Sequence, residues 1–152
     1  VPRRNPNLME RVFAWYFFNN KINKYLVPIE DSVRIVLETI KKFSPINNEI
    51  IVVGFSQGGY IAPFIAKELA LAKDCIQICA RIRTELLKEK YNFNLHAIHG
   101  EQDKLVSIDR VKKCFDEFIV YGNKGSFSGL ADLDHDITKQ VKEKFKSIIE
   151  NL

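Results

Sequence analysis

The sequence predicts a single α/β domain over residues 1–152, with a mainly parallel sheet and helices on both faces. A chain of 152 residues that is 46% hydrophobic has the size and composition of one domain with its own core. Short runs of β-branched apolar residues alternate with segments whose apolar residues recur at helical spacing. This alternation implies parallel strands joined by right-handed crossovers. The loops that follow the strands then meet at one edge of the sheet, where such folds carry out their chemistry.

The stretch up to about Pro28 has no clear period, and we expect an irregular segment lying over a hydrophobic surface. It carries a dense aromatic patch, formed by Phe13, Trp15, Tyr16, Phe17 and Phe18. A helix is predicted to begin at Pro28, because apolar residues between Ile29 and Ile40 recur at helical spacing. Acidic residues in its first turn and lysines in its last turn suit the helix dipole.

From residue 50 onward, strands and helices are predicted in strict alternation. The strands are expected at 50–54, 75–80, 93–98 and 125–130, and the helices at about 58–72, 81–90, 107–120 and 136–150. Pro63 falls in the first turns of the 58–72 helix, where a missing amide costs least. The helix at 81–90 is predicted from its alternating charges. Gly122 is expected to end the helix at 107–120.

Composition narrows the classes of function. The net charge of +4 is spread over segments of mixed sign, which favours solvated faces over a nucleic-acid groove. Three cysteines without a C-x-x-C pair or a histidine at ligand spacing argue against a zinc site or a disulfide framework, and favour a reducing compartment such as the cytoplasm. No apolar run approaches the ~20 residues needed to span a bilayer, so stable membrane insertion is not expected.

The most informative motif lies directly after the strand at 50–54. Residues 54–59 read Gly-Phe-Ser-Gln-Gly-Gly and lead into a helix, which is the arrangement of a nucleophile elbow. A serine on such a turn projects its hydroxyl above the sheet, and glycines two positions away on either side let neighbouring backbone pass close by. Ser56 is therefore the candidate nucleophile. A structural strand-turn-helix that happens to contain a serine is the alternative.

A serine hydroxyl needs a base, and the chain offers three histidines. His96 lies inside the strand at 93–98, where a structural role is favoured. His99 stands beside Gly100 at the end of that strand and is expected to support the turn. His135 precedes the last helix, in a loop at the reactive edge, and is the predicted base.

The base needs a carboxylate to orient it. Asp103 follows His99 by four residues on the reactive edge and is the predicted acid, with Asp109 as the runner-up. Three further aspartates, Asp132, Asp134 and Asp136, are near neighbours of the predicted base and are expected to be helix caps or solvated charges. Asp136 in particular is expected to be a first-turn or capping residue of the last helix.

These motifs resemble the carboxylesterase and acyl-protein thioesterase branch of the α/β-hydrolases, the phospholipase/carboxylesterase family. That family carries G-F-S-Q-G-G at the elbow, H-G-x-x-D at the acid and a histidine before the last helix. The chain has the first motif at 54–59 and the second at 99–103, and the order Ser56, Asp103, His135 is the family's order. The likeness extends to Pro2-Arg3-Arg4 and Trp15.

The resemblance implies hydrolysis of a carboxylic ester or thioester through an acyl-enzyme. In that reaction Ser56 attacks, His135 moves the proton, Asp103 orients His135, and the backbone amide of Gln57 binds the oxyanion. No metal or organic cofactor is implied. The expected substrate is a small acyl ester or an acylated protein, and the oligomeric state stays open, with a homodimer among the alternatives.

The chain departs from the family in two places. Ala80-Arg81 stands where the family has small residues of the Ser-Gly type, which changes the shape expected for the substrate pocket. The family's first strands and their oxyanion loop are also missing, so only the amide of Gln57 is identifiable as an oxyanion donor. Residues 50–53 would then form an exposed apolar edge, and we expect a truncated chain, or an edge covered by another chain or by the aromatic segment.

Other functions remain open at this stage. A non-catalytic interaction protein could keep the hydrolase fold without useful turnover, and a peptidase or lactonase would share the same acyl-enzyme chemistry.

Overall fold

The computed structural model describes residues 2–4, 11–16, 18–19, 21–22, 24–25, 28–43 and 48–152. Its contacts separate the chain into two compact units, Val1–Ile46 and Asn47–Leu152, each of which is described by itself.

The amino-terminal unit contains two short antiparallel pairs and one helix. Strand β1 (Pro2–Arg4) pairs with β2 (Arg11–Phe13), and β3 (Phe18–Asn19) pairs with β4 (Lys24–Tyr25). The expected irregular segment therefore contains short hairpins. In the aromatic patch, Tyr16 is buried and Trp15 is 42% exposed, whereas Phe17 lies outside the described residues.

Helix α1 (Ile29–Phe43) lies where the apolar spacing predicts it. Its first turn is acidic and its last turn is basic, as the dipole favours. Ile29 and Val33 are buried, and the hydroxyl of Ser32 donates a hydrogen bond to the carbonyl of Trp15. This bond joins the helix to the aromatic segment within the same unit.

The carboxyl-terminal unit is a parallel four-stranded sheet, as predicted. Its strands lie in the order β5 (Ile50–Phe55), β6 (Ala72–Ile78), β7 (Asn94–Gly100) and β8 (Lys124–Leu130). Every neighbouring pair is parallel, so the carboxyl ends of all four strands meet at one edge of the sheet. This edge receives the loops that carry the predicted site residues.

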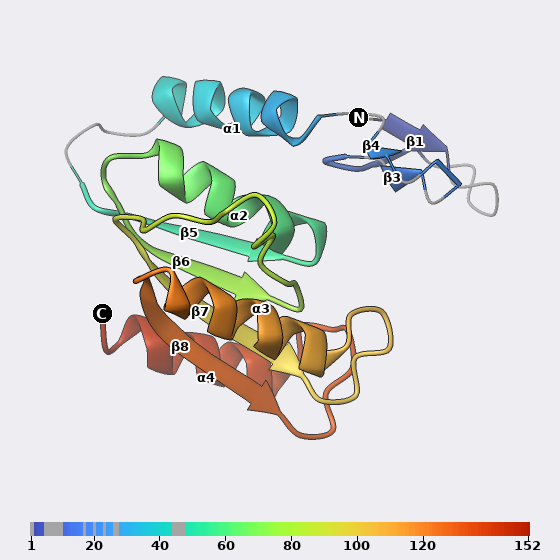
Figure 1. Ribbon diagram of the computed structural model, residues 1–152, viewed down its shortest axis with the longest axis vertical. Coiled ribbons are helices and arrows are strands. Elements are labelled where there is room, and N and C mark those ends of the chain that lie inside the picture. The colour runs from blue at the N-terminus through green and yellow to red at the C-terminus, as the bar shows by residue number, and fades with distance from the viewer. Residues whose placement is uncertain are drawn as a thin grey trace. The chain divides into compact units, whose positions relative to one another are not determined.

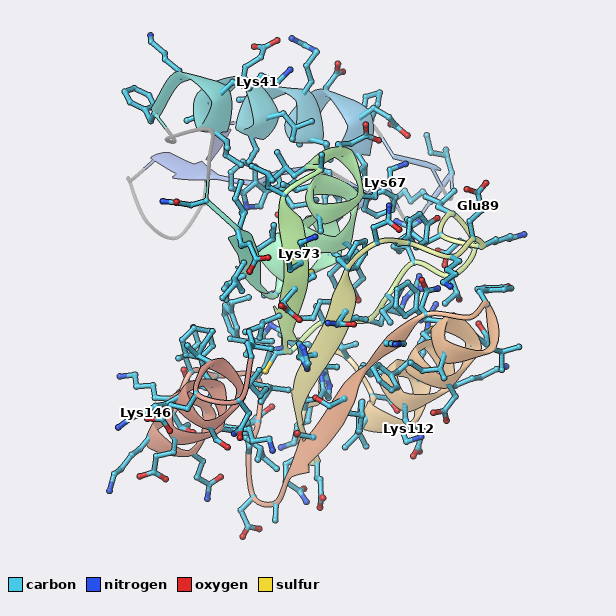
Figure 2. All side chains as sticks on the ribbon, turned by 90° about the vertical axis from the view of Figure 1, so that its left-hand side faces the viewer. Lys41, Lys67, Lys73, Glu89, Lys112 and Lys146 are labelled. Atoms are coloured by element: carbon cyan, nitrogen blue, oxygen red, sulfur yellow. The ribbon has the colours of Figure 1, made fainter. Side chains whose placement is uncertain are left out.

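Helices cover both faces of this sheet. Helix α2 (Gln57–Glu68) packs on β5 and β6, and α3 (Ile108–Val120) packs on β7 and β8. Helix α4 (Lys139–Ile149) packs on the other face, where Val141 and Ile148 join the core formed by Ile76 and Ile98. Figure 2 shows Lys112 on α3 and Lys146 on α4 projecting from opposite sides of the sheet, and Figure 1 shows the same arrangement.

Pro63 lies inside α2 and leaves one helical carbonyl without its usual partner. A proline has no amide hydrogen to give to the residue four positions earlier, which is Gly59. The structure supplies a replacement donor, because the side-chain amide of Gln77 on β6 donates to the carbonyl of Gly59 at 2.7 Å. The first turns of α2 are thereby joined to the sheet directly behind Ser56.

The helix predicted over 81–90 is wrong. The backbone makes a single turn, in which the carbonyl of Arg83 accepts from the amides of Leu86 and Leu87. The charged side chains that suggested a helix bind one another within the loop, since Arg81 and Arg83 both pair with Glu85. Two apolar residues of the loop, Ile82 and Leu87, are buried, whereas Leu86 is exposed.

Other boundaries shift by a few residues. Helix α2 ends at Glu68 instead of residue 72, β6 begins at Ala72 instead of residue 75, and α4 begins at Lys139 instead of residue 136. Helix α3 ends before Gly122, as predicted, with Gly122 at a φ of 87°.

Among the described residues, β5 pairs with β6 alone and forms one edge of the sheet. Two of its apolar side chains are exposed, Ile51 by 39% and Val53 by 46%. The expected edge position of this strand is therefore confirmed for the part of the chain that the structure describes. No helix in that part is both long and apolar enough to cross a membrane.

Candidate active site

Ser56 stands on a sharp turn between β5 and α2. Its backbone has a φ of 51°, a left-handed conformation that is rare for a residue with a side chain. The amide of Ser56 donates to the carbonyl of Ile78 on the neighbouring strand at 2.9 Å, which fixes the turn against the sheet. Gly59 is needed for close approach, because a Cβ there would lie 2.6 Å from the Cβ of Ala80.

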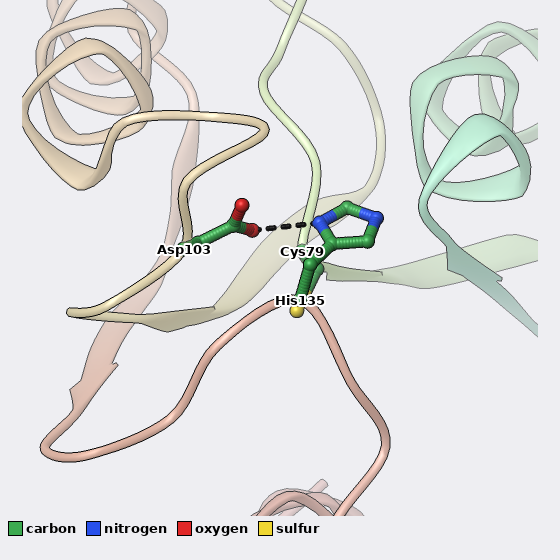
Figure 3. A group of neighbouring side chains, drawn as sticks. All are labelled: Cys79, Asp103 and His135. Atoms are coloured by element: carbon green, nitrogen blue, oxygen red, sulfur yellow. Dashed lines mark hydrogen bonds and ion pairs between the residues drawn. The ribbon is translucent and has the colours of Figure 1, made fainter.

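The side chain of His135 lies between Ser56 and Asp103. Its Nε2 atom is 2.8 Å from Oγ of Ser56, and its Nδ1 atom is 2.8 Å from Oδ2 of Asp103. Figure 3 shows the second of these contacts. When Nδ1 carries the proton and donates it to the carboxylate, Nε2 is free to accept the serine proton. The structure thus brings the three predicted residues into one hydrogen-bonded chain.

Asp103 is held as an anion by its surroundings. Burial alone would raise its pKa, but the amide of Val106, the side chain of His135 and the amide of Leu105 together lower the pKa below its ordinary value. Both amides donate to the same oxygen, Oδ1, at 2.9 Å, which leaves Oδ2 facing the imidazole. A carboxylate with two backbone donors has a fixed orientation, so it can fix the ring of His135 in turn.

The other histidines have structural partners. Nε2 of His99 is 2.7 Å from the carbonyl of Val106, and burial lowers the pKa of His99, which favours a neutral ring that donates to this carbonyl. His99 therefore supports the acid turn, as the sequence predicts. His96 lies between Asp74 at 3.1 Å and Ser126 at 2.8 Å on the sheet itself.

The other candidate acids lie apart from the imidazole. Asp109 is exposed in the first turn of α3, and Asp132 is exposed as well. Oδ1 of Asp136 accepts from the amide of Ile137 in the loop before α4. The expectation that Asp136 caps the last helix is wrong, because α4 begins later and its N-cap residue is Thr138.

Asp134 has a role that the sequence did not reveal. Its carboxylate accepts from its neighbour, the amide of His135, at 2.8 Å and from the amide of Lys104 at 3.3 Å. It therefore joins the loop of the base to the turn of the acid. Gly100 allows the same two loops to meet, because a Cβ at Gly100 would lie 2.2 Å from the carbonyl of Leu133.

Cys79 is a second residue that sequence reasoning missed. It follows β6 with a φ of 50°, is fully buried, and places Sγ within 4.8 Å of ligand atoms of both Asp103 and His135. Burial, and next the charge of Asp103, raise the pKa of this thiol to about 11. Its amide donates to the carbonyl of Ile98 at 3.0 Å, so the backbone beneath the site is fixed.

Arg81 stands where the resemblance led us to expect a small residue. The guanidinium of Arg81 lies over the ring of Tyr60, at 5.9 Å from the ring centroid, and forms a two-pronged ion pair with Glu85. Tyr60 lies one helical turn after Ser56, since its amide donates to the serine carbonyl. The departure at Ala80-Arg81 therefore places a large, charge-paired side chain against the first turn of α2.

Gln57 is the first residue of α2. Its amide therefore stands at the positive end of the helix dipole, a position suited to an anion.

Comparisons with known proteins bear on both the family and the fold of the chain. The sequence profile of the phospholipase/carboxylesterase family matches residues 18–152, and no curated protein sequence matches the chain. Among solved structures, esterase PE8 has a TM-score of 0.74 and 17% identity, over 90% of this chain and 69% of that one. Acyl-protein thioesterase 2 of Zea mays has a TM-score of 0.71 and 15% identity, over 91% and 71% of the two chains.

SOBER1 of Arabidopsis thaliana has a TM-score of 0.66 and 15% identity, over 93% of this chain and 75% of that one. Identities this low bear on the fold alone, which in each case agrees with the α/β arrangement described above. The family profile covers most of the sequence, including the elbow, the acid turn and the loop of the last histidine. On that ground the chain belongs to the phospholipase/carboxylesterase family and has the α/β-hydrolase fold.

Proposed function

We propose that this chain hydrolyses carboxylic esters or thioesters through an acyl-enzyme. The observation that carries the proposal is the continuous hydrogen-bonded chain from Ser56 through His135 to Asp103, with the serine on a left-handed turn. Three loops that are far apart in sequence supply these residues. Membership of a family named for phospholipases and carboxylesterases supports the same chemistry.

Each residue has a defined part in the reaction. Nε2 of His135 takes the proton from Oγ of Ser56 as the oxygen attacks the acyl carbon, and then gives it to the leaving oxygen or sulfur. Asp103 keeps the other ring proton on Nδ1 and stabilises the imidazolium while it lasts. The amide of Gln57 donates to the oxyanion, and water releases the acyl group by the same steps in reverse order.

The proposed substrates are small acyl esters or acylated proteins, with no metal or organic cofactor. Crystal structures of an esterase and of an acyl-protein thioesterase are among the structures similar to this chain, which supports both substrate classes. All three cysteines are free and buried, which supports a reducing compartment such as the cytoplasm. We propose neither nucleic-acid binding nor stable membrane insertion, and a homodimer is one assembly to test.

A non-catalytic interaction protein is the second candidate. It is favoured by the oxyanion side of the site, where sequence reasoning identifies the amide of Gln57 alone, because loss of one donor typically costs ~10²- to 10³-fold in rate. Peptidases and lactonases would use the same triad, so they differ from the proposal in substrate and not in mechanism.

The deciding experiment measures hydrolysis of p-nitrophenyl acetate and p-nitrophenyl octanoate, together with labelling by a fluorophosphonate. The chain should hydrolyse the esters and react at Ser56, and Ser56→Ala should lose both properties. Ser126→Ala is the matched control, because Ser126 also contacts a histidine but lies in mid-strand. Equal background rates from folded wild-type and Ser56→Ala protein, without labelling, would favour the non-catalytic candidate.

A further inference from the structure

Three side chains that are good metal ligands meet at the proposed site, two of them from the triad itself and the third, Cys79, from the loop after β6. Sγ of Cys79, a carboxylate oxygen of Asp103 and a ring nitrogen of His135 all lie within 4.8 Å of one another. Figure 3 shows the three side chains on separate loops, with Asp103 facing the imidazole of His135. They follow β6, β7 and β8, so the sheet positions all three.

The chemistry of this set selects a narrow class of ions. A thiolate, an imidazole and a carboxylate are the ligands that Zn²⁺ takes in proteins, whereas Mg²⁺ and Ca²⁺ prefer oxygen ligands alone. Three protein ligands also leave a fourth position for water, which tetrahedral Zn²⁺ accepts. We propose that Cys79, Asp103 and His135 form an inhibitory site for Zn²⁺ and similar thiol-seeking divalent ions.

The geometry allows such an ion after a small adjustment. Bonds of about 2.3 Å to sulfur and 2.0–2.2 Å to nitrogen and oxygen place tetrahedral ligand atoms about 3.3–3.7 Å apart. Ligand atoms that now lie up to 4.8 Å apart would close by up to about 1.5 Å, and Nδ1 of His135 and Oδ2 of Asp103, now 2.8 Å apart, would open by about 0.5 Å. The side chain of His135 is 13% exposed, so an ion would reach the site from solvent past the imidazole ring.

Binding of the ion displaces the protons that its ligand atoms now carry. The Cys79 thiol loses its proton, because a coordinating thiol is deprotonated by the metal. Nδ1 of His135 gives up the proton that it now shares with Asp103 at 2.8 Å, and Nε2 takes one up, so the ring stays a neutral imidazole and the net release to solvent is the thiol proton. No oxidation or reduction takes place.

The expected consequence is loss of turnover, and this part of the inference rests on the proposed function. A ring whose Nδ1 binds a cation cannot become an imidazolium when Ser56 gives up its proton. Movement of the ring by a fraction of an ångström toward Cys79 would also lengthen the 2.8 Å contact between Nε2 and Oγ of Ser56. Zn²⁺ acts here as an inhibitor, so the reaction itself still needs no metal.

The first test detects the metal site without any enzyme activity. Tag-free protein is titrated with Co²⁺, a spectroscopic substitute for Zn²⁺, and a thiolate-to-cobalt charge-transfer band is followed in the near ultraviolet. The band should form in wild-type protein and be lost in Cys79→Ser. It should persist in Cys114→Ser, the control, because Cys114 is also a buried thiol but lies on α3. An equal band in Cys79→Ser would overturn the proposal.

The second test measures the Zn²⁺ concentration that halves the rate of p-nitrophenyl acetate hydrolysis, with each variant compared to its own metal-free rate. Cys79→Ser should raise this concentration by at least about tenfold, while Mg²⁺ should have no effect on either protein. Equal inhibition of wild type and Cys79→Ser would mean that Zn²⁺ acts without the thiol, and would refute the site.

The two tests separate the metal site from the proposed function. A Cys79-dependent cobalt band in a protein without turnover would keep the site and refute the hydrolase. Turnover without such a band would do the opposite. If circular dichroism shows that Cys79→Ser is unfolded, His135→Gln is tested in its place. Because His135 is one of the three proposed ligands, this variant should bind Co²⁺ at least about tenfold more weakly than wild type. Unchanged Co²⁺ binding would overturn the proposal.

Discussion

Asp103→Asn should nearly abolish hydrolysis while leaving the fold intact. The reason lies in how the carboxylate is held. Oδ1 accepts the amides of Leu105 and Val106, both at 2.9 Å, so this side of the group must remain an oxygen. The new side-chain amide of an asparagine would therefore take the place of Oδ2, which now faces Nδ1 of His135 at 2.8 Å.

An amide nitrogen at that position donates a hydrogen bond and cannot accept one. The imidazole would therefore change tautomer: Nδ1 would accept the hydrogen bond from the asparagine amide, and the ring proton would move to Nε2. Nε2 would then donate to Oγ of Ser56 and could not take its proton. Where an aspartate of such a triad is replaced in this way, the rate falls by about 10⁴-fold, which corresponds to about 5.5 kcal/mol in the barrier.

The assay compares kcat/KM for p-nitrophenyl acetate between wild type, Asp103→Asn and Asp109→Asn, with circular dichroism as the check of folding. Asp109→Asn is the matched control, because Asp109 is exposed and lies in the first turn of α3. It should change kcat/KM less than twofold. Retention of more than a tenth of the wild-type rate by folded Asp103→Asn would refute the orienting role of the carboxylate.

Three further predictions concern stability. Gly59→Ala should destabilise the fold by about 1–3 kcal/mol because its Cβ would meet that of Ala80. Adding Ala80→Gly should restore part of the thermal stability, since the carbonyl of Gly54 would still lie 3.0 Å from the new Cβ; a double variant no more stable than the single one would contradict the contact with Ala80. Gln77→Leu should cost about 1–3 kcal/mol in urea unfolding by removing the donor to the Gly59 carbonyl, and Pro63→Ala should recover part of that loss in the same chain; no recovery would count against the explanation. Because the pKa of Asp103 is lowered in the folded state, its carboxylate stabilises the fold fully above the ordinary aspartate pKa of about 3.9, and this stabilisation is lost as pH falls through the lower folded-state pKa. The free energy of unfolding in urea should therefore depend less on pH in this range for Asp103→Asn than for wild type. An equal dependence on pH in the two proteins would refute this contribution of Asp103.

The sequence predicted the sheet and the positions of the three site residues because both depend on local patterns. A β-branched run followed by Gly-x-Ser-x-Gly specifies a strand, a turn and a helix, and a residue that follows a parallel strand must lie at the carboxyl edge. The position after a strand excludes His96, whereas the choice over His99 and the other aspartates also used the turn at Gly100, their adjacency to His135 in the sequence and the chain order of the triad. The hydrogen bonds that join them were beyond sequence reasoning, since they depend on the packing of three loops.

The failures have a physical pattern as well. In the loop at 81–90, Arg81 and Glu85 stand at helical spacing, but their ion pair forms without a helix because buried apolar residues and Glu117, which binds Thr84, hold the loop on α3. Cys79 gave no signal because nothing in the sequence reports its left-handed backbone. Pro63 does indicate that the carbonyl of Gly59 lacks its helical partner, but not that Gln77 on another strand supplies the donor. Each of these features arises from a contact between distant segments.

The sheet itself contains a second set of one aspartate, one histidine and one serine. Comparing it with the proposed triad shows which features favour a catalytic serine. His96 lies between Asp74 and Ser126 at distances similar to those in the proposed triad. The set arises from register, since His96 stands beside Ser126 on β8 and one pleat along from Asp74 on β6.

The ring of His96 is turned the other way, with Nδ1 toward the serine and Nε2 toward the acid. Ser126 lies within β8, with no turn to project its hydroxyl and no helix beginning behind it to receive an oxyanion. Ser56 has both features, since it stands on a left-handed turn at the start of α2. The same three residue types therefore form a hydrogen-bonded chain twice in this fold, with the histidine ring reversed. The turn before a helix is what favours Ser56 over Ser126 as the nucleophile.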